Sequence, residues 1–285
     1  MEKEMAQHEG EMWGRVFSRG NMYAALERVQ QNGGAPGVDG MKEKELPEHL
    51  RQHWESIREK LDTGSYRPSP VKRVEIPKPG GGKRQLGIPT VLDRMIQQAL
   101  QQVLSEEFEG RFSDYSYGYR TGKSAHDAVE AAREHIEAGY QWVVDIDLEK
   151  FFDTVNHDRL MARMKAKIAD KRVLRLVNEY LKAGVMADGV VVRSEVGTPQ
   201  GGPLSPLLSN IVLSELDEKL EERGHRFVRY ADDCNIYVKS ERAAQRVMES
   251  TSRFIERRMR LKVNEKKSAV GLAVKRQFLG FSFYY

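Results

Sequence analysis

The most informative segment for the fold of this chain is Tyr230-Ala231-Asp232-Asp233-Cys234-Asn235-Ile236-Tyr237-Val238. Apolar and β-branched residues flank the acidic pair, so residues 227–237 predict two strands folded on a tight turn at Ala231-Asp232. Aspartates are ordinary turn residues, and the doublet alone favours turn chemistry over a function. Motifs elsewhere in the chain are needed to distinguish an ordinary turn from a functional acidic pair.

A second acidic pair lies in the β-branched run at residues 142–148, which also predicts a strand. Side chains alternate along a strand, so Asp145 and Asp147 face one way while the three apolar residues beside them face the core. Carboxylates on adjacent strand ends repel each other unless divalent cations neutralise them. Mg²⁺ uses a couple of carboxylates together with waters and substrate phosphates. The pattern therefore predicts two-metal displacement at phosphorus, which needs no protein nucleophile.

Hydrophobic periodicity predicts the other elements around these two strands. Helices are expected at residues 13–31, 46–61, 90–108, 124–138, 205–224 and 242–259 and after His157, and further strands at 190–192, 268–272 and 278–284. Strand, helix, hairpin, helix, strand is the split β-α-β plan of a ferredoxin-like antiparallel sheet. The expected fold class is α+β, with a helical and loop-rich N-terminal half.

The composition of the chain excludes several classes of protein. The chain has 285 residues, 46 Lys+Arg, 42 Asp+Glu and a formal net charge of +4. No run approaches the roughly 18 apolar residues that cross a bilayer, and the mixed, acidic residues 1–4 argue against a secretory signal, so we expect a cytoplasmic protein without a membrane segment. Cys234 is the single cysteine, which excludes intrachain disulfides and cysteine zinc sites; it is expected to be a small buried residue.

Basic residues concentrate in three blocks, at residues 67–94, 159–182 and 239–276. The third block has twelve lysines and arginines against four acids. Each block alone is more often a solvated helix face than a binding surface. Three such blocks in one chain suit a protein that grips phosphate backbones.

The motifs around the acidic pairs resemble those of reverse transcriptases, specifically the group II intron branch. They are Ile76-Pro77-Lys78-Pro79 with Arg84-Gln85-Leu86-Gly87-Ile88-Pro89, Ser116-Tyr117-Gly118-Tyr119-Arg120, Asp147-Leu148-Glu149-Lys150-Phe151-Phe152-Asp153, Gly197-Thr198-Pro199-Gln200-Gly201-Gly202-Pro203-Leu204-Ser205-Pro206 and the Tyr-Ala-Asp-Asp hairpin. They occur in family order from about residue 33 to residue 281, so the resemblance covers nearly the whole chain.

The resemblance implies a right-hand polymerase with fingers and a palm, the palm being the ferredoxin-like split β-α-β sheet. The implied division is an N-terminal extension and start of the fingers at 1–66, fingers and connecting helices at 67–140, and a palm at 141–285 with inserted fingers helices at about 159–198. The chain stops just after the last palm motif, so we expect a fingers–palm portion of a longer protein without its thumb. The apolar end, residues 278–285, is expected to be exposed and to favour a homodimer of the fragment.

The catalytic residues implied by the resemblance are Asp147, Asp232 and Asp233. Asp147 and Asp232 would hold two Mg²⁺ ions, with Mn²⁺ as a substitute, assisted by the backbone carbonyl of Leu148. Asp145 would be a neighbour with a secondary role or none.

The implied nucleotide-binding residues come from four separate motifs. Lys78 and Arg84 match residues that clamp the incoming triphosphate, and Gln200 matches a glutamine beside the nascent base pair. Phe152 matches the bulky residue that excludes a 2′-hydroxyl, although a core aromatic is an equally good interpretation of it.

The resemblance implies an RNA-directed DNA polymerase that uses dNTPs, an RNA template and a DNA primer. An RNA-binding splicing cofactor, or maturase, that grips intron RNA is the alternative, and the two activities can coexist in one protein. Retron, diversity-generating and CRISPR-linked reverse transcriptases are the related alternatives; the Gly-Gly-Pro-Leu-Ser-Pro after Gln200 favours the group II intron type.

Overall fold

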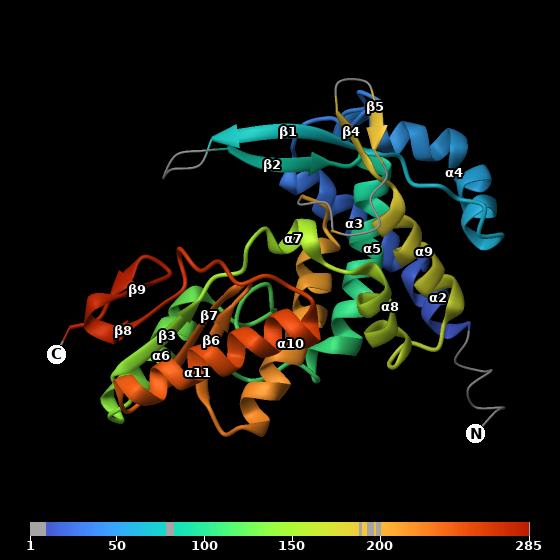
Figure 1. The fold of residues 1–285 in the computed structure, drawn as a ribbon. Coiled ribbons are helices and arrows are strands. Elements are labelled where there is room, and N and C mark those ends of the chain that lie inside the picture. Colours follow the sequence, from blue (N-terminus) through green and yellow to red (C-terminus); the bar gives the residue numbers. More distant parts are fainter. Residues whose placement is uncertain (1–9, 78–82, 188–189, 193–196, 198–200, 285) are drawn as a thin grey trace, which may run out of the picture. The chain divides into compact units, whose positions relative to one another are not determined.

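The computed structural model describes residues 10–77, 83–187, 190–192, 197 and 201–284. Lys78 and Gln200 therefore lie outside the described residues. The chain divides into two compact units (Figure 1). Unit 1 comprises Met1–Glu107 and Asn156–Ser205, and unit 2 comprises Phe108–Val155 and Pro206–Tyr285.

Unit 1 is rich in helices, as its sequence predicts. They are α2 (Glu11–Val16), α3 (Arg19–Asn32), α4 (Leu46–Asp62), α5 (Val91–Glu109), α8 (His157–Lys165) and α9 (Lys171–Lys182), with a short 3₁₀ turn at Glu43–Glu45. The expected single helix at residues 13–31 is wrong, because the chain breaks between α2 and α3. Ser18 has an extended backbone and its hydroxyl accepts a hydrogen bond from the Asn21 amide, which starts a new helix there.

The sheet of unit 1 was largely missed at the sequence level. β1 (Val71–Pro77) pairs antiparallel with β2 (Lys83–Ile88) and parallel with β4 (Val185–Ala187), which pairs with β5 (Val190–Val192). The strand order is β2-β1-β4-β5. Most of β1 is exposed, so it lacks the apolar alternation by which a half-buried strand is recognised. Only β5 was expected.

A buried carboxylate joins three segments of unit 1. Asp93, at the start of α5, accepts hydrogen bonds from the hydroxyls of Tyr66, Thr90 and Tyr180 at 2.8, 2.7 and 3.2 Å and from the Ser69 amide at 3.0 Å. Burial raises the pKa of Asp93, and these hydrogen bonds oppose that rise. The network fixes the entry to β1 against α5 and α9.

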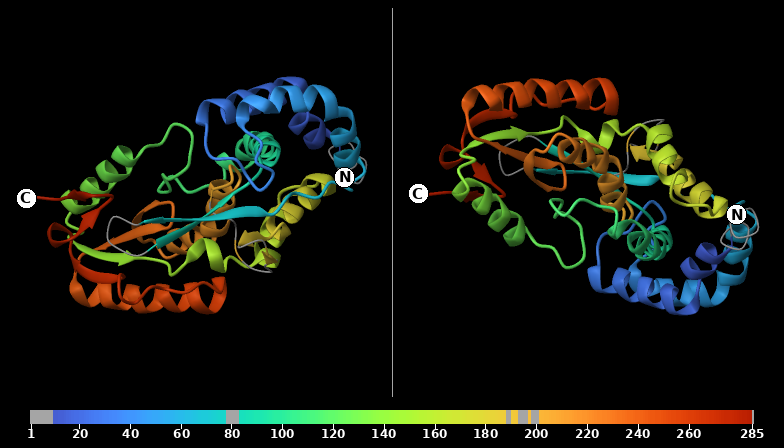
Figure 2. Two further views of the ribbon diagram at one scale, coloured as in Figure 1. Left: turned by 90° about the horizontal axis from the view of Figure 1, so that it is seen from above. Right: turned by 90° about the horizontal axis from the view of Figure 1, so that it is seen from below.

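Unit 2 contains the predicted antiparallel sheet. Its strands are β3 (Trp142–Ile146), β6 (Arg226–Tyr230), β7 (Asp233–Val238) and β8 (Ala269–Leu272), in the order β6-β7-β3-β8. Helix α6 (Ala125–Glu137) and helix α11 (Glu241–Phe254) cover its two opposite faces (Figure 2). The split β-α-β arrangement read from the sequence is therefore present.

Both faces of β3 are buried at its N-terminal end, which the sequence pattern did not indicate. Val143 lies on the same face as Asp145 and is 1% exposed, because it packs in a cluster with Ala132 and Ile136 of α6. Val144, on the other face, is also buried. Only the C-terminal end of the strand is polar.

The end of the chain differs from the expected long strand. Residues 277–282 form a small hairpin of β9 (Gln277–Phe278) and β10 (Phe281–Ser282), because Leu279 and Gly280 both have a positive φ. Phe278 is buried in the cluster beside α6, whereas Phe281 and Tyr284 are 41% and 89% exposed. The expectation of a wholly exposed apolar end is thus wrong for Phe278.

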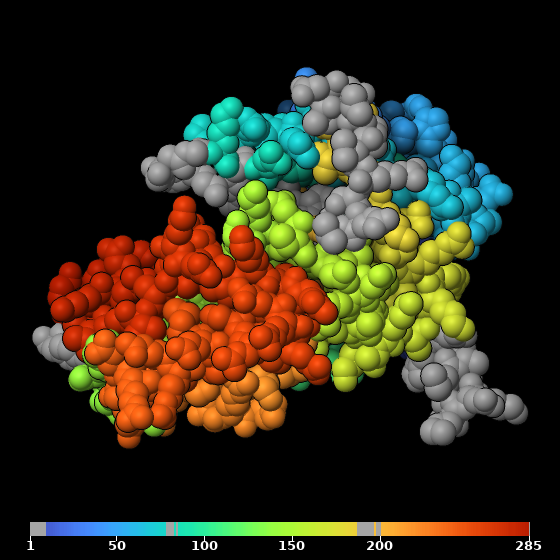
Figure 3. Space-filling model, in the orientation of Figure 1, coloured from blue at the N-terminus to red at the C-terminus, as the bar shows by residue number. Residues whose placement is uncertain are grey.

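The remaining elements of unit 2 are the short helix α7 (Phe151–Thr154), α10 (Ser205–Glu222), a π-helical turn at Ile255–Met259 that continues α11, and a 3₁₀ turn at Ala273–Lys275. Helix α11 and the turn lie at the surface on the face seen in Figure 3. In the described part of the chain no helix combines the length and the apolar character needed to cross a bilayer.

Candidate catalytic site

The acidic hairpin of unit 2 is a two-residue turn. Tyr230 at the end of β6 pairs with Asp233 at the start of β7, which leaves Ala231 and Asp232 as the loop. Ala231 has φ +57°, a left-handed conformation that a two-residue hairpin usually assigns to glycine. A residue with a Cβ is held there at a cost of about 1 kcal/mol. The turn is therefore a strained one that its surroundings must stabilise.

The two acidic pairs meet because β3 and β7 are neighbours. Asp145 pairs with Asn235 and Ile146 with Cys234, so continuing the register by one residue brings Asp147 opposite Asp233. Burial raises the pKa of Asp233 to about 7, and the charges of Asp145, Asp232 and Asp147 add to that rise. The two acidic pairs, expected on adjacent strand ends, do lie on neighbouring strands.

Asp147 is held by a segment that follows Met259. The Asn264 side-chain amide donates to Asp147 Oδ1 at 2.9 Å, and the Asn264 backbone amide donates to the Asp147 carbonyl at 2.9 Å. Ser268 Oγ accepts from the Asp147 amide at 3.0 Å, and Lys267 Nζ lies 3.6 Å from Asp147 Oδ2. Sequence reasoning missed these supporting residues, and nothing in their local pattern points to Asp147.

Asp145 has a different partner from the other aspartates. Its carboxylate forms an ion pair and hydrogen bond with the guanidinium of Arg276. Among the described lysines and arginines, none forms an ion pair with Asp232 or Asp233. Asp145 is thus neutralised by the protein, whereas Asp232 and Asp233 are not.

The carboxylates of Asp232 and Asp233, which the protein does not neutralise, favour a divalent cation with few protein ligands over a metal ion held by protein side chains alone. No group of three or more histidine, cysteine, aspartate and glutamate side chains is placed to hold a metal ion within the described ranges. Mg²⁺ needs fewer protein ligands, because waters and substrate phosphates complete its shell. Asp147 and Asp232 could supply two carboxylates, and the Leu148 backbone is fixed beside them by its bridge to Val263.

The expected nucleotide-binding residues are only partly described. Phe152, on α7, is 8% exposed and packs edge-to-face on Phe151 at 5.2 Å, and both interpretations of it remain predictions. Arg84 lies on β2 opposite Ile76, in unit 1. Within that unit, a Cβ at Gly201 would meet the Gly87 carbonyl at 2.6 Å, so the glycine-rich motif lies directly against β2.

Cys234 is 1% exposed on β7, which confirms the expected buried thiol. Burial raises its pKa, so it stays protonated and has no role as a nucleophile at neutral pH.

Comparison with known proteins identifies the family to which the chain belongs. Residues 76–283 match the family model described as "Reverse transcriptase (RNA-dependent DNA polymerase)". The chain belongs to the reverse transcriptase family. The match covers both acidic pairs and the glycine-rich motif, and the resemblance and fold class predicted from the sequence are confirmed.

The relatives with similar sequence include proteins of group II introns. "Group II intron-encoded protein LtrA" of Lactococcus lactis subsp. cremoris is 35% identical over 208 residues, which cover 73% of this chain and 34% of LtrA. "Protein YkfC" of Escherichia coli (strain K12) is 32% identical over 273 residues, covering 82% of this chain and 72% of YkfC. The chain therefore spans about a third of LtrA and most of YkfC.

Solved structures agree on the fold alone. Telomerase from Candida tropicalis in complex with a telomeric RNA fragment has a TM-score of 0.57 at 15% identity, over 80% of this chain and 47% of that one. The Cas6-RT-Cas1–Cas2 complex has a TM-score of 0.52 at 24% identity, over 85% of this chain and 26% of that one.

Proposed function

We propose that this chain extends a DNA primer on an RNA template with deoxynucleoside triphosphates. The observation that carries the proposal is the group of aspartates at the ends of β3 and β7 in a chain of the reverse transcriptase family. Asp147 and Asp232 are the proposed metal ligands, together with the Leu148 carbonyl, and Asp233 completes the catalytic group.

In the proposed reaction the primer 3′-oxygen attacks the α-phosphorus of the nucleotide. A P–O bond to the primer forms, the bond to the β-phosphate oxygen breaks, pyrophosphate leaves, and the 3′-hydroxyl proton passes to solvent. Two bound Mg²⁺ ions, or Mn²⁺ in their place, would supply activation of the attacking oxygen and stabilisation of the leaving oxygen. The aspartates would contribute a fixed cluster of negative charge that attracts these cations, and Asn264 and Ser268 keep Asp147 in place within it.

The nucleotide contacts are also part of the proposal. Lys78 and Arg84 would contact the triphosphate, Gln200 the nascent base pair, and Phe152 the sugar. The close packing of Gly201 against Gly87 supports a shared role for the two motifs that carry Arg84 and Gln200. The proposed division is an N-terminal extension and start of the fingers at 1–66, fingers and connecting helices at 67–140, and a palm at 141–285 with inserted fingers helices at about 159–198. Residues 1–107 and these inserted helices belong to unit 1, whereas residues 108–140 belong to unit 2.

Binding of intron RNA is a second candidate function, favoured by exposed cations on unit 2. The exposed cations of α11 and the turn after it are Arg242, Arg246, Arg253, Arg257 and Arg258. Phosphate backbones are bound by such cations without need of the aspartates. With intron RNA as the ligand, this function would be that of a maturase. Two separate proposals are a cytoplasmic location and a homodimer formed through the exposed Phe281 and Tyr284.

Primer extension on an RNA template with dNTPs and Mg²⁺ tests the polymerase assignment. We expect extension by the wild-type chain and a loss of more than about a hundredfold in Asp232→Asn, because a metal-ligating carboxylate is lost while the shape of the turn is kept. Glu249→Gln, an exposed change on α11, is the matched control. Extension that survives in Asp232→Asn would overturn the assignment of this site.

RNA affinity measured on the same proteins separates the two functions. Asp232→Asn should bind RNA as tightly as the wild type, because the aspartate does not serve that role. A wild-type chain that binds RNA tightly and makes no DNA would leave only the splicing-cofactor function.

A further inference from the structure

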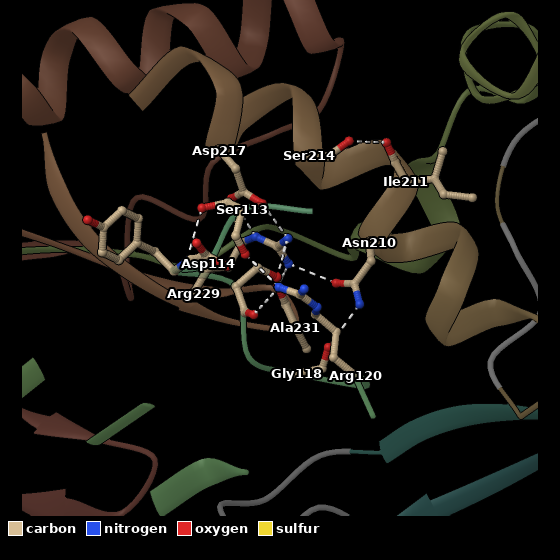
Figure 4. Close-up of polar contacts among 12 residues, drawn as sticks. Ser113, Asp114, Gly118, Arg120, Asn210, Ile211, Ser214, Asp217, Arg229 and Ala231 are labelled. Carbon is tan, nitrogen blue, oxygen red and sulfur yellow. Dashed lines mark hydrogen bonds and ion pairs between the residues drawn. The ribbon is translucent and has the colours of Figure 1, made fainter. Parts of the chain in front are cut away.

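A fully buried guanidinium lies directly beneath the acidic turn. Arg229, on β6, is 0% exposed, and all five of its N–H groups are hydrogen-bonded (Figure 4). Nε and Nη2 donate to Asp217 Oδ1 and Oδ2 at 2.7 and 2.6 Å, and Nη2 also donates to Ser116 Oγ at 2.8 Å. Nη1 donates to Asn210 Oδ1 at 3.0 Å and to the Ala231 carbonyl at 2.7 Å.

The bond to Ala231 reaches the peptide that precedes Asp232. The Ala231 carbonyl and the Asp232 amide belong to one planar peptide unit, so fixing the carbonyl fixes the direction in which the Asp232 backbone leaves the turn. Ala231 is also the residue with the left-handed φ of +57°. A charge-assisted hydrogen bond from a guanidinium is well suited to hold this conformation.

The loop between α5 and α6 packs against the same turn. A Cβ at Gly118 would meet the Ala231 amide nitrogen at 2.2 Å, so only glycine fits there. The Asn210 side-chain amide donates to the Gly118 carbonyl at 2.8 Å while its oxygen accepts from Arg229. Arg120 donates to the Ser116 carbonyl at 2.8 Å and thereby holds the loop from its far end.

We propose that Arg229 is a positioning residue for the reaction: together with Asp217 and Asn210 it locks the Ala231–Asp232 peptide so that the Asp232 carboxylate is aimed at the metal site. The proposal rests on the proposed function of Asp232. It assigns a role to the Ser116–Arg120 motif, which presents Gly118 to the turn. The buried ion pair is then a device that sets the geometry of a metal ligand.

The alternative is that the buried cluster only stabilises unit 2. Arg229→Lys keeps the charge but cannot reproduce five donors in a planar fork. For a folded Arg229→Lys protein we expect kcat to fall by about ten- to a hundredfold and the half-saturating Mg²⁺ concentration to rise severalfold, with the KM for primer–template unchanged. Val247→Ala, which shortens a buried side chain of α11, is the control for lost stability and should change neither kinetic value below its melting temperature.

Ala231→Gly supplies a test that a merely structural role does not predict. Glycine adopts the left-handed conformation without the cost of a Cβ. Placed in the Arg229→Lys background, it should restore part of kcat and of the Mg²⁺ response, although it replaces none of the lost hydrogen bonds. Circular dichroism establishes that each variant is folded.

If Arg229→Lys is folded with wild-type kcat and Mg²⁺ response, or if Ala231→Gly restores nothing, the positioning role is wrong. If the wild type makes no DNA, the proposed function fails instead, and Mn²⁺ binding followed by electron paramagnetic resonance decides the role of Arg229. Weaker Mn²⁺ binding in Arg229→Lys than in the wild type would support it, and equal binding would overturn it.

Discussion

The aspartates around the ends of β3 and β7 are compensated unequally. Arg276 pairs with Asp145, and Lys267 and Asn264 approach Asp147, so two of the carboxylates have partners within the protein. The unequal compensation affects Asp233 most, because burial and the charges of the neighbouring aspartates raise its pKa to about 7. A cation bound between Asp147 and Asp232 would remove this repulsion, which gives the metal site a physical basis independent of any resemblance.

A second buried group in unit 2 predicts how stability depends on pH. His135 of α6 lies 5.5 Å from the ring of Tyr237, and its Nε2 is buried without a hydrogen-bond partner among the described residues. Burial lowers the pKa of His135, and the nearby charge of Arg226 adds to this, while a hydrogen bond with the Phe227 backbone and the charge of Glu134 oppose it. Between this lowered pKa and the ordinary value of about 6.5, the unfolded chain binds a proton that the folded chain does not.

The contribution of His135 to the free energy of unfolding should therefore fall as the pH drops below about 6.5, whereas the raised pKa of Asp233 works in the opposite direction, so the variant is compared with the wild type at each pH. His135→Phe keeps the ring and removes the titration, so we expect a smaller loss of stability between pH 7.5 and 5 than in the wild type, measured by urea unfolding. His126→Phe, an exposed change on the same helix, is the control. Equal pH dependence in His135→Phe and wild type would contradict the prediction.

At the level of residues, the sequence predicted the aspartates but not what holds them. Asp145, Asp147, Asp232 and Asp233 lie in two short periodic segments whose strands are adjacent in the sheet. Their partners are distant in the chain: Asn264 is 117 residues from Asp147, and Arg276 is 131 from Asp145. Local patterns carry no information about such contacts.

Helix α6 allows the contribution of an N-terminal cap to stability to be tested. Ser124 Oγ accepts from the Asp127 amide at 3.2 Å, and the Asp127 carboxylate accepts from the Ser124 amide at 2.7 Å, forming a reciprocal cap. Ser124→Ala should lower the free energy of unfolding by about 1 kcal/mol, measured by urea denaturation. Ser124→Thr keeps the acceptor and should retain most of the stability; equal losses in the two variants would show that the cap is not the cause.

Elements with a strong local signal were predicted well. The strands β3, β6 and β7 and the cap of α6 follow from β-branched runs, a tight turn and a serine with an acid three residues later. The β1–β2 hairpin was missed because its exposed strands lack apolar alternation. The hairpin at residues 277–282 was missed because Leu279 adopts a positive φ that its residue type does not suggest.

At the scale of the whole molecule, the net charge of +4 hides a patterned surface. For RNA binding, the dependence of log K on log salt should reveal how many phosphates the exposed cations contact. The triple variant Arg246→Gln, Arg253→Gln, Arg257→Gln should lower the magnitude of this slope by about 2, at about 0.7 per contacted phosphate of a single strand. Filter binding at several salt concentrations measures the slope.

The control removes cations that acids already neutralise. Arg51, Arg133 and Lys219 pair with Glu48, Glu130 and Glu222, so their replacement by glutamine should leave the slope nearly unchanged. Similar effects of the two triple variants would mean that affinity follows overall charge and not the α11 surface.

The division of the chain into two units has a spectroscopic consequence. Of the three tryptophans, Trp13 and Trp54 belong to unit 1, and Trp142 alone belongs to unit 2, where it lies on β3 between Val238 and Leu272. A chain that keeps only Trp142 would emit solely from the sheet that carries the aspartates. Its fluorescence would then follow the folding of that sheet, and the arrival of nucleic acid or metal there, without a signal from the other unit.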